Sequence, residues 1–469
     1  MEARAKIFNI LLTVFLILSV TPCYAVKTLS LEDCVGIALK NDPNVRVATE
    51  YKNIAKSKVG VAKSDYFPGL NLGANYNYQN NNTSGLYGST YGNKTGQINL
   101  GVNQLIWNFG KTGANINMQK YNLKASTYDL AQAVLNTTYQ VKMAYFGVLA
   151  ALANEDISER TVVIYKLHYQ LTKSMFEEGL KSKIDVVNAQ ANLADSEIQL
   201  LSSQMAYQNS VIALSNAMFY TDKESYSVKN TENFNFGDIV EPDSKNIVNV
   251  SYKTNEKEDN VIITGIERNN IMENYTFTPF KMTLDEAIDT AYKNRPDLQS
   301  LMFVEKSQEE FLKTVKRMYY PALTAGAGYN MRQNYDTQMS ANSFTLQAGL
   351  NFPLINAMSI KYQIDAGKAY LKIAGDNVDL LKQNVYFEVQ RNYVSMVQLE
   401  KRIPLLEKKV EYTLENLELA DGRYSVGLGD FIELKDAQQN YNNAQLAFVQ
   451  CVFDYNIARE TLQKSIGGG

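Results

Sequence analysis

The chain has 469 residues, and its 46 basic and 49 acidic side chains leave a formal net charge of -3. This balance, without a basic stripe, argues against a nucleic-acid partner. The single histidine, with no nucleophile elbow or phosphate loop elsewhere, argues against an enzyme, so we expect no catalytic and no metal-binding residues.

The N-terminus has the three parts of a secretory signal peptide. Arg4 and Lys6 precede an apolar run over residues 7–20, and a small-x-small sequence ends at Ala25. We therefore expect residues 1–25 to be a signal peptide that is cleaved during export.

The cysteines and the hydropathy restrict where the exported chain can reside. A lipid anchor on Cys23 is the weaker alternative, because Pro22 precedes it. Cys34 and Cys451 remain after cleavage and could pair in an oxidising periplasm, but two cysteines are no disulfide framework. No later run of about 18 apolar residues predicts a transmembrane helix. The periplasm, the medium and an outer membrane entered as β-structure remain possible.

The sequence contains an internal duplication. "LSLEDCVGIALKNDPNV" at 29–45 recurs as "MTLDEAIDTAYKNRPDL" at 282–298, and "YFPGL" at 66 recurs as "YYPAL" at 319. The predicted organisation is a first repeat over 26–220, an inter-repeat segment over 221–281, a second repeat over 282–466 and a tail over 467–469. We expect each repeat to contain a helix, a β-hairpin, a long helix and a short helix, with Pro43 and Pro296 fixing turns.

Each repeat holds one predicted β-hairpin, at about 66–110 and about 319–356. Apolar and small polar residues alternate strictly in both, which is typical of strands with one apolar face. Lys94 is the only charged residue between Tyr66 and Gly110. Strands of about 10 residues with aromatic ends are typical of outer-membrane hairpins, although a soluble sandwich is the alternative. The predicted interfacial aromatic residues are Tyr66, Phe67, Trp107 and Phe109.

The rest of each repeat has helical periodicity. In the last helix of each repeat, large residues recur every seven positions and small residues follow three behind, which predicts coiled-coil packing. The second repeat shows this in Leu434, Tyr441, Phe448, Tyr455 and Leu462, interleaved with Ala437, Ala444, Cys451, Ala458 and Ser465. In the first repeat a second apolar row lies beside the first, so two neighbouring helices are expected. That row is Ala191, Ala194, Ile198, Leu201 and Met205.

Two hairpins supply only four strands per chain. A membrane barrel needs at least about eight strands, and an open sheet edge is not tolerated in lipid. The chain must therefore oligomerise to insert, and this argument does not fix the number of copies.

Nearly the whole mature chain resembles the TolC-type outer-membrane efflux channels, also called outer membrane factors. The resemblance rests on the duplicated opening, on "Y-[FY]-P-x-L" before each first strand and on "YSVG" at 424–427 with the acids that follow. It implies an α+β membrane protein that is a homotrimer, with a 12-stranded β-barrel in the outer membrane continued by a 12-helix coiled-coil α-barrel in the periplasm. It also implies a periplasmic adaptor, an inner-membrane pump or ABC exporter as partners, contact with outer-membrane lipid, and no cofactor.

The same resemblance assigns roles at two matching helix turns, "FEEGLKSKIDVVNAQ" at 176–190 and "YSVGLGDFIELKDAQ" at 424–438. These turns form the periplasmic tip in the family, and polar links hold the tip closed. By position, the pore acids are Glu433 and Asp436, and the gate-linking pair is Asp185 and Tyr424. Gly429 stands where the well-known pattern has a linking arginine, so the closed state is expected to have fewer links.

The same residues also have a purely structural interpretation. Ser182 with Asp185, and Asp430 with Glu433, fit the spacing of a helix capping box. Gly179 and Gly427 fit helix C-terminal glycines. Capping does not account for Asp436, which lies one turn further into its helix.

The function implied is an outer-membrane tunnel for small molecules or proteins, the exit duct of a tripartite efflux pump or a type I secretion system. A structural or adhesive coiled-coil stalk is the alternative, although a stalk has no need of paired acids at a turn. His168 is expected to be a packing or surface residue.

Overall fold

The computed structural model describes residues 27–82, 90–220, 226–228, 279–352 and 357–468. The expected signal peptide, and most of the expected inter-repeat segment, lie outside these residues. The chain forms two compact units, each built from three stretches of sequence. The first is Met1–Asn41, Gln140–Pro279 and Leu399–Ile457, and the second is Asp42–Tyr139, Phe280–Gln398 and Ala458–Gly469.

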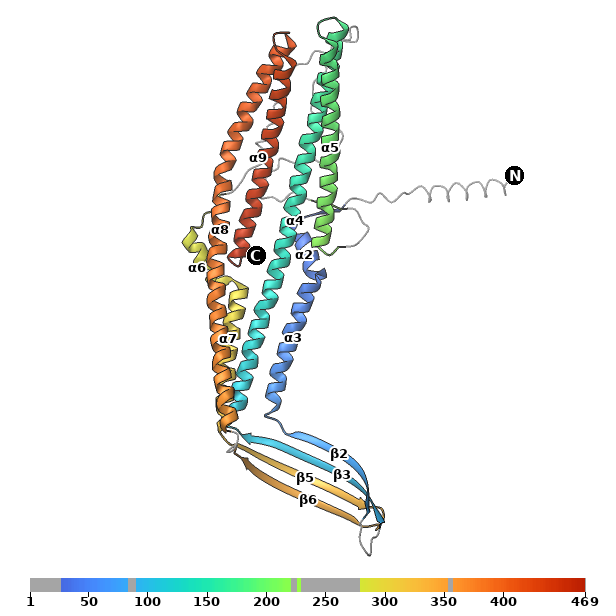
Figure 1. Cartoon of the computed structure of the whole chain (residues 1–469), viewed down its shortest axis with the longest axis vertical. Coiled ribbons are helices and arrows are strands. Elements are labelled where there is room, and N and C mark those ends of the chain that lie inside the picture. The colour runs from blue at the N-terminus through green and yellow to red at the C-terminus, as the bar shows by residue number, and fades with distance from the viewer. Residues whose placement is uncertain (1–26, 83–89, 221–225, 229–278, 353–356, 469) are drawn as a thin grey trace, which may run out of the picture. The chain divides into compact units, whose positions relative to one another are not determined.

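The order of elements after the first short strand is the same in both halves of the sequence (Figure 1). Two helices are followed by two strands and then by two longer helices. The first set is α2 (Leu31–Asn41), α3 (Pro43–Ser64), β2 (Gly69–Asn82), β3 (Thr90–Trp107), α4 (Lys111–Glu177) and α5 (Lys183–Ala217). The second is α6 (Leu284–Asn294), α7 (Pro296–Lys316), β5 (Ala322–Asn334), β6 (Ser340–Asn351), α8 (Ala357–Ser425) and α9 (Phe431–Ser465).

The expectation of one helix before each hairpin was wrong in both halves. Pro43 and Pro296 each begin a second helix, because proline lacks a backbone N–H and suits the first helical position. Asp42 caps α3 by accepting a hydrogen bond from Asn44 N at 2.7 Å. Its second oxygen accepts from the Thr137 hydroxyl, so this nearly fully buried carboxylate is satisfied.

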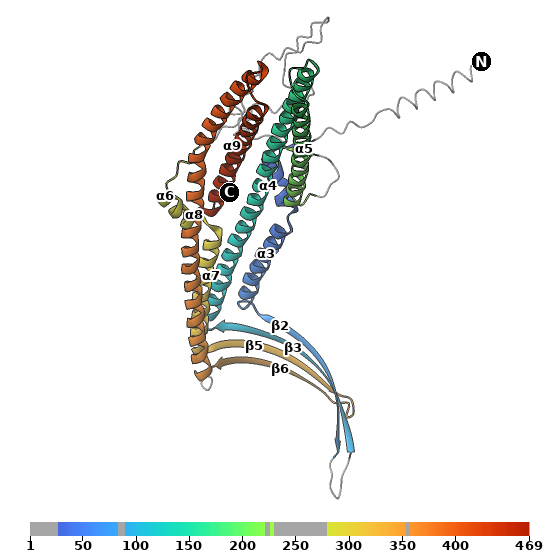
Figure 2. The same ribbon diagram turned by 45° about the horizontal axis from the view of Figure 1, so that its top comes forward.

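The four long strands form one antiparallel sheet in the second unit, in the order β2-β3-β5-β6 (Figure 2). They have 14, 18, 13 and 12 residues, longer than the expected 10 or so. β3 pairs with β5, so the two hairpins share one sheet. β2 and β6 are its edges, each with one strand partner among the described residues.

The two faces of this sheet differ as the alternation predicts. Cross-strand register places Leu72, Leu100, Tyr329 and Phe344 in one apolar row. The neighbouring residues on the opposite face are asparagine, glycine, threonine and serine. In the isolated chain the apolar face is open, with 75% of Leu72 exposed.

Helices α4 and α8 have 67 and 69 residues, and the structure keeps Pro404 inside α8. Within the described residues, no helix combines the length and the hydropathy that crossing a membrane requires.

The heptad pattern of the last helix corresponds to burial, as predicted. In α9 the large residues Leu434, Phe448, Tyr455 and Leu462 are buried, and Tyr441 is partly buried. The interleaved Ala437, Ala444, Cys451 and Ser465 are buried as well. In α5 the small-residue row is buried at Ala189, Ser196 and Ser203, whereas Ile198, Leu201 and Met205 of the second row are more than half exposed.

The first unit also contains a short two-stranded sheet and both cysteines that follow the expected signal peptide. β1 (Lys27–Leu29) pairs in parallel with β4 (Tyr226–Val228), a contact the sequence did not suggest. Cys34 and Cys451 are both free and buried, so they do not pair with each other. Burial, helped by the charge of Asp33, raises the pKa of the Cys34 thiol to about 12.

Candidate functional site

The candidate site consists of the two helix turns of the first unit, between α4 and α5 and between α8 and α9. Gly179 and Gly427 lie where the helices end, as predicted, with φ of +79° and +78°. The backbone bonds also match: Leu180 N donates to Met175 O at 2.8 Å, and Leu428 N donates to Arg423 O at 2.9 Å. Both turns therefore have the same backbone geometry.

The first turn continues into a helix through a side-chain cap. The Asp185 carboxylate accepts hydrogen bonds from the Ser182 backbone N–H at 3.1 Å and from the Ser182 hydroxyl at 2.7 Å. The bond to the Ser182 backbone N–H is the one that the acid of a capping box makes, and it satisfies that group at the start of α5.

The second turn is held mainly by close backbone packing. A Cβ on Gly429 would lie 2.9 Å from Tyr424 N and 3.0 Å from the carbonyl carbon of Arg423. Only glycine fits this approach without a shift of the chain. The Arg423 guanidinium lies 3.6 Å from the Glu433 carboxylate, and both side chains are about half exposed. This ion pair therefore contributes little to stability, about 0.5 kcal/mol or less.

Tyr424 is a large side chain that is almost completely buried, at 1% exposure. Its hydroxyl is 3.2 Å from the Thr172 hydroxyl of α4, and the Lys181 ammonium lies 4.0 Å from its ring centre. Burial raises the pKa of Tyr424, and the charges of Asp185 and Asp430 add to this, whereas the hydrogen bond shared with Thr172 lowers it.

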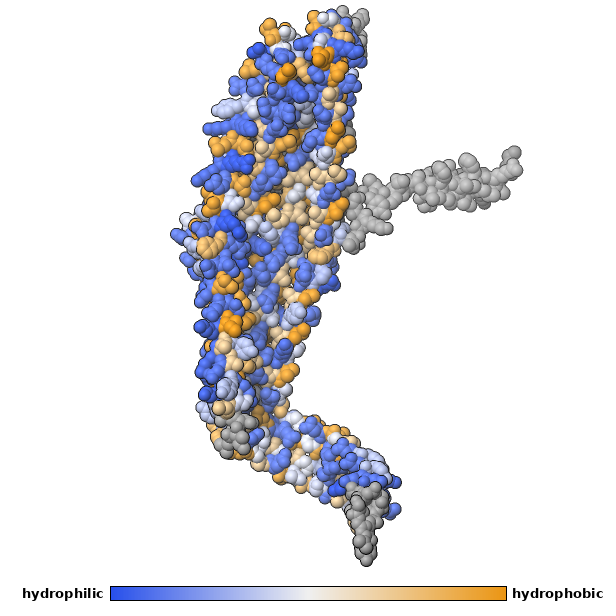
Figure 3. Space-filling view, in the orientation of Figure 1, coloured by the Kyte–Doolittle hydropathy of each residue, from blue (hydrophilic) through white to orange (hydrophobic). Residues whose placement is uncertain are grey.

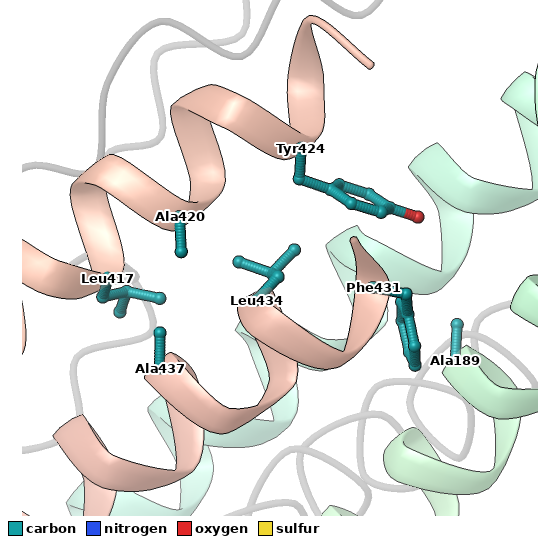
Figure 4. Close-up of a cluster of buried hydrophobic side chains, with 7 residues drawn as sticks. All are labelled: Ala189, Leu417, Ala420, Tyr424, Phe431, Leu434 and Ala437. Atoms are coloured by element: carbon teal, nitrogen blue, oxygen red, sulfur yellow. The ribbon is translucent and has the colours of Figure 1, made fainter. Parts of the chain in front are cut away.

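Tyr424 belongs to a hydrophobic cluster that joins three helices (Figure 4). Its ring centre is 6.2 Å from that of Phe431 on α9. The remaining members are Leu417 and Ala420 of α8, Leu434 and Ala437 of α9, and Ala189 of α5. The cluster, together with the hydroxyl contact to α4, fixes the α8–α9 turn against the α4–α5 pair.

The predicted gate-linking residues have separate partners in the structure. Tyr424 pairs with Thr172, and Asp185 pairs with Ser182. Asp185 is nevertheless near enough for its charge to act on the Tyr424 hydroxyl. A direct link between Asp185 and Tyr424 stays a prediction.

The predicted pore acids lie on the first turns of α9. Glu433 and Asp436 are both exposed, and they are three residues apart, so they project from the same side of the helix. Asp430, which is also exposed, immediately precedes α9. The structure thus places two carboxylates on one open helix face beside the turn.

Exposed apolar side chains accompany these acids (Figure 3). Leu180 and Ile184 of the first turn and Leu428 and Ile432 of the second are all more than 60% exposed. The end of each helix pair is therefore partly apolar.

A second predicted group, the interfacial aromatic residues, lies where the strands meet the helices. Tyr66, Phe67, Trp107 and Phe109 are all exposed. The ring centres of Trp107 and Phe109 are 6.1 Å apart, and Phe109 stacks on Tyr320 at 5.2 Å. The prediction missed Tyr320, although the repeat of "YFPGL" as "YYPAL" aligns it with Phe67.

The prediction also missed three residues that contact the second turn, namely Thr172, Lys181 and Arg423. Their contacts join residues far apart in sequence, or depend on side-chain direction, so no local pattern marks them. His168 is a packing residue: its Nε2 lies 4.0 Å from the Asp421 carboxylate, one helical turn from the Thr172–Tyr424 contact. Burial lowers the pKa of His168, and Asp421 partly opposes this shift.

No group of three or more potential metal ligands is found among the residues for which the structure gives positions.

The model of the family "Outer membrane efflux protein" matches residues 35–218 and 287–468 of this sequence. These two segments together make up most of the chain, and each holds one of the two turns. The chain belongs to the outer membrane efflux protein family.

Similar proteins agree with this assignment. The chain is 20% identical over 461 residues to "Probable efflux pump outer membrane protein TtgC" of Pseudomonas putida, covering 94% of this chain and 83% of the relative. It is 22% identical over 171 residues to "Alkaline protease secretion protein AprF" of Pseudomonas aeruginosa, covering 36% and 35%. The crystal structure of the outer membrane protein VceC from Vibrio cholerae has a TM-score of 0.72 at 18% identity, with 94% and 96% of the two chains covered.

Membership of this family gives the cellular location of the chain and its broad class of protein. This chain is an outer-membrane protein with the fold of the TolC-like channels, and it is not an enzyme.

Proposed function

We propose that this chain is the exit duct of a tripartite efflux pump or a type I secretion system. It exports small molecules, proteins or both across the periplasm and the outer membrane. Its partners are a periplasmic adaptor and an inner-membrane pump or ABC exporter. The family supports this, as do similar proteins named for an efflux pump and for protease secretion.

The observation that carries the proposal is the open four-stranded sheet. One face is apolar and exposed, and the edges β2 and β6 each leave a row of backbone groups for another strand. Lipid cannot satisfy these groups, so further copies must complete the sheet. Three copies supply the 12 strands of a closed barrel, whose polar face lines the channel.

The helices support the same assembly. The row of Ile198, Leu201 and Met205 on α5 is exposed in the single chain although its spacing is that of a packed seam. In the proposed homotrimer this row packs against a neighbouring helix. The two repeats, 26–220 and 282–466, each contribute two long helices, so three copies form a 12-helix α-barrel.

The two helix turns form the periplasmic gate in this proposal. Glu433 and Asp436 line the constriction, and the contacts of Tyr424 hold the second turn in its closed position. Asp185 lies beside Tyr424 and is the acidic partner of that link. Because Gly429 carries no side chain, the cationic contacts of this turn come from Arg423, which pairs with Glu433, and from Lys181, which lies over the ring of Tyr424.

Ion selectivity in planar bilayers tests the gate residues. The variant with Glu433→Ala and Asp436→Ala is compared with a control that has Asp376→Ala and Asp379→Ala. The control pair has the same spacing and is exposed on α8. We expect the tip variant to lose cation preference and to resist block by a trivalent cation, because carboxylate rings favour cations.

The outcomes separate the channel from its gate. Equal selectivity in the wild type, the tip variant and the control would contradict the pore-acid assignment while leaving the channel intact. The absence of current from a correctly assembled oligomer, even with Tyr424→Phe, would contradict the channel and favour a structural stalk.

A further inference from the structure

The polar face of the sheet has a single charged side chain. The four strands of this sheet contain two charged residues, Lys94 and Arg332, and both are positive. Cross-strand register assigns them to opposite faces: Lys94 pairs with Tyr78 in the apolar row, whereas Arg332 pairs with Gln97. Lys94 therefore belongs to the row that faces lipid in the proposed barrel, and Arg332 to the row that faces the channel.

The surroundings of Arg332 are neutral. Its cross-strand row is Asn75, Gln97, Arg332 and Ala341. The adjacent rows of the same face form a shallow groove of about 390 Å³, lined in part by Gly73, Asn99, Gly101, Asn330 and Ser343. Arg332 is thus the longest side chain on a wall of short, neutral residues.

No acid on the strands balances this charge. The nearest acid in sequence, Asp336, lies in the turn beyond β5, and its carboxylate accepts a hydrogen bond from the backbone N–H of Lys94. Arg332 is exposed, and no ion pair joins it to another side chain in the described part of the chain. Its charge is therefore directed into the space beside the polar face.

We propose that Arg332 forms a ring of positive charge inside the outer-membrane barrel and makes this end of the duct prefer anions. The proposal rests on the proposed function, because the ring needs several copies of the chain around one channel. Rings of arginine or lysine side chains attract anions where the wall has few other charges. The duct then has acids at the tip and bases at the exit, so anionic solutes or anionic groups of a cargo are favoured at the last step.

The test uses full-length protein in planar bilayers under a potassium chloride gradient. The parent carries Glu433→Ala and Asp436→Ala, so that the tip does not dominate the selectivity. We expect Arg332→Gln to raise the potassium-to-chloride permeability ratio about twofold and Arg332→Glu to raise it more, about fourfold. Arg332→Lys keeps the ratio of the parent, because it keeps the charge.

Lys94→Gln is the matched control, since it removes the same charge from the other face of the same sheet. It leaves the ratio unchanged if the proposal is correct. A ratio that does not respond to Arg332→Gln, or that responds equally to Lys94→Gln, overturns the proposal. If the parent forms no channel at all, the proposed function fails and this inference fails with it, whereas a conducting parent that is insensitive to Arg332 overturns this inference alone.

Discussion

The two helix turns have the same backbone conformation, but different side-chain contacts hold them in place. Positions 248 residues apart correspond, so Phe176 matches Tyr424 and Lys181 matches Gly429. Phe176 is 40% exposed, whereas Tyr424 is 1% exposed. The first turn relies on a local capping box, and the second relies on a buried aromatic ring and a glycine packed against backbone.

This difference predicts that the two turns respond differently when neighbouring helices move. A turn held by local bonds keeps its shape when its neighbours move. A turn held by Thr172 and Lys181 of the other helix pair depends on that pair. We therefore expect the second turn to change position when the helix pairs separate, and it is also the turn that carries Glu433 and Asp436.

The largest expected difference in stability is between variants at the two matching aromatic positions, Tyr424 and Phe176. Tyr424→Ala should lower the free energy of unfolding by about 3 kcal/mol or more, because it empties a buried site. Phe176→Ala should cost only about 1 kcal/mol, because that ring is partly exposed. Thermal unfolding of the detergent-purified protein, followed by circular dichroism, measures both. Equal losses would contradict the asymmetry of the turns.

The glycines give the next largest effect. Gly429→Ala should cost about 2 kcal/mol, because its Cβ would meet backbone atoms of Arg423 and Tyr424. Gly179→Ala and Gly427→Ala should each cost about 1 kcal/mol, since both have a positive φ and open space around the Cβ. The same thermal measurement ranks the three variants, and a Gly429→Ala protein as stable as Gly427→Ala would refute the packing argument.

Acidification should lower the free energy of unfolding through His168 of α4. Burial holds the folded-state pKa of His168 below its usual value of 6.5, despite Asp421. Around and below pH 6.5 the unfolded chain therefore binds up to one more proton than the folded chain, and stability falls with decreasing pH until the folded histidine is also protonated. The slope is at most about 1.4 kcal/mol per pH unit.

His168→Gln provides the control for this pH effect. The free energy of unfolding of both proteins is measured in urea between pH 7.5 and 5.5. The wild type should lose stability toward pH 5.5, and the variant should lack this contribution. If the free energies of unfolding of the two proteins changed in parallel with pH, His168 would not contribute to the pH dependence.

The smallest expected effects are the stability losses on removing the acids that follow the two turns. Asp185→Ala should cost about 1 kcal/mol, because it removes both bonds to Ser182. Glu433→Ala should cost less than about 0.5 kcal/mol, because Arg423, its ion-pair partner among the described residues, is half exposed. A larger loss at Glu433 than at Asp185, by the same urea measurement, would reverse the roles given to these acids.

Much of the fold could be predicted from regular patterns in the sequence. The 248-residue offset of Gly179 and Gly427 predicted two helix ends of one kind, and the seven-residue spacing predicted the buried row of α9. Alternation predicted strands with unlike faces. Pro43 was misinterpreted because a proline suits both a turn and the first position of a helix, and the sequence around it does not separate these uses.

The contacts of the site could be predicted only in part. The capping box of Ser182 and Asp185 spans three residues, so its spacing is visible in the sequence. The hydroxyl pair of Thr172 and Tyr424 joins residues 252 apart. Such a contact depends on how two helices are rotated against each other, and no pattern within either helix determines that rotation.

The central claim is that the second turn closes a tunnel, and single-channel recording of the wild type and Tyr424→Phe tests it most directly. The variant removes the hydroxyl contact with Thr172 and keeps the ring. We predict small currents in the wild type that a trivalent cation blocks from one side only, and larger currents in the variant. Assembled wild-type and variant proteins that both carry no current would contradict the claim.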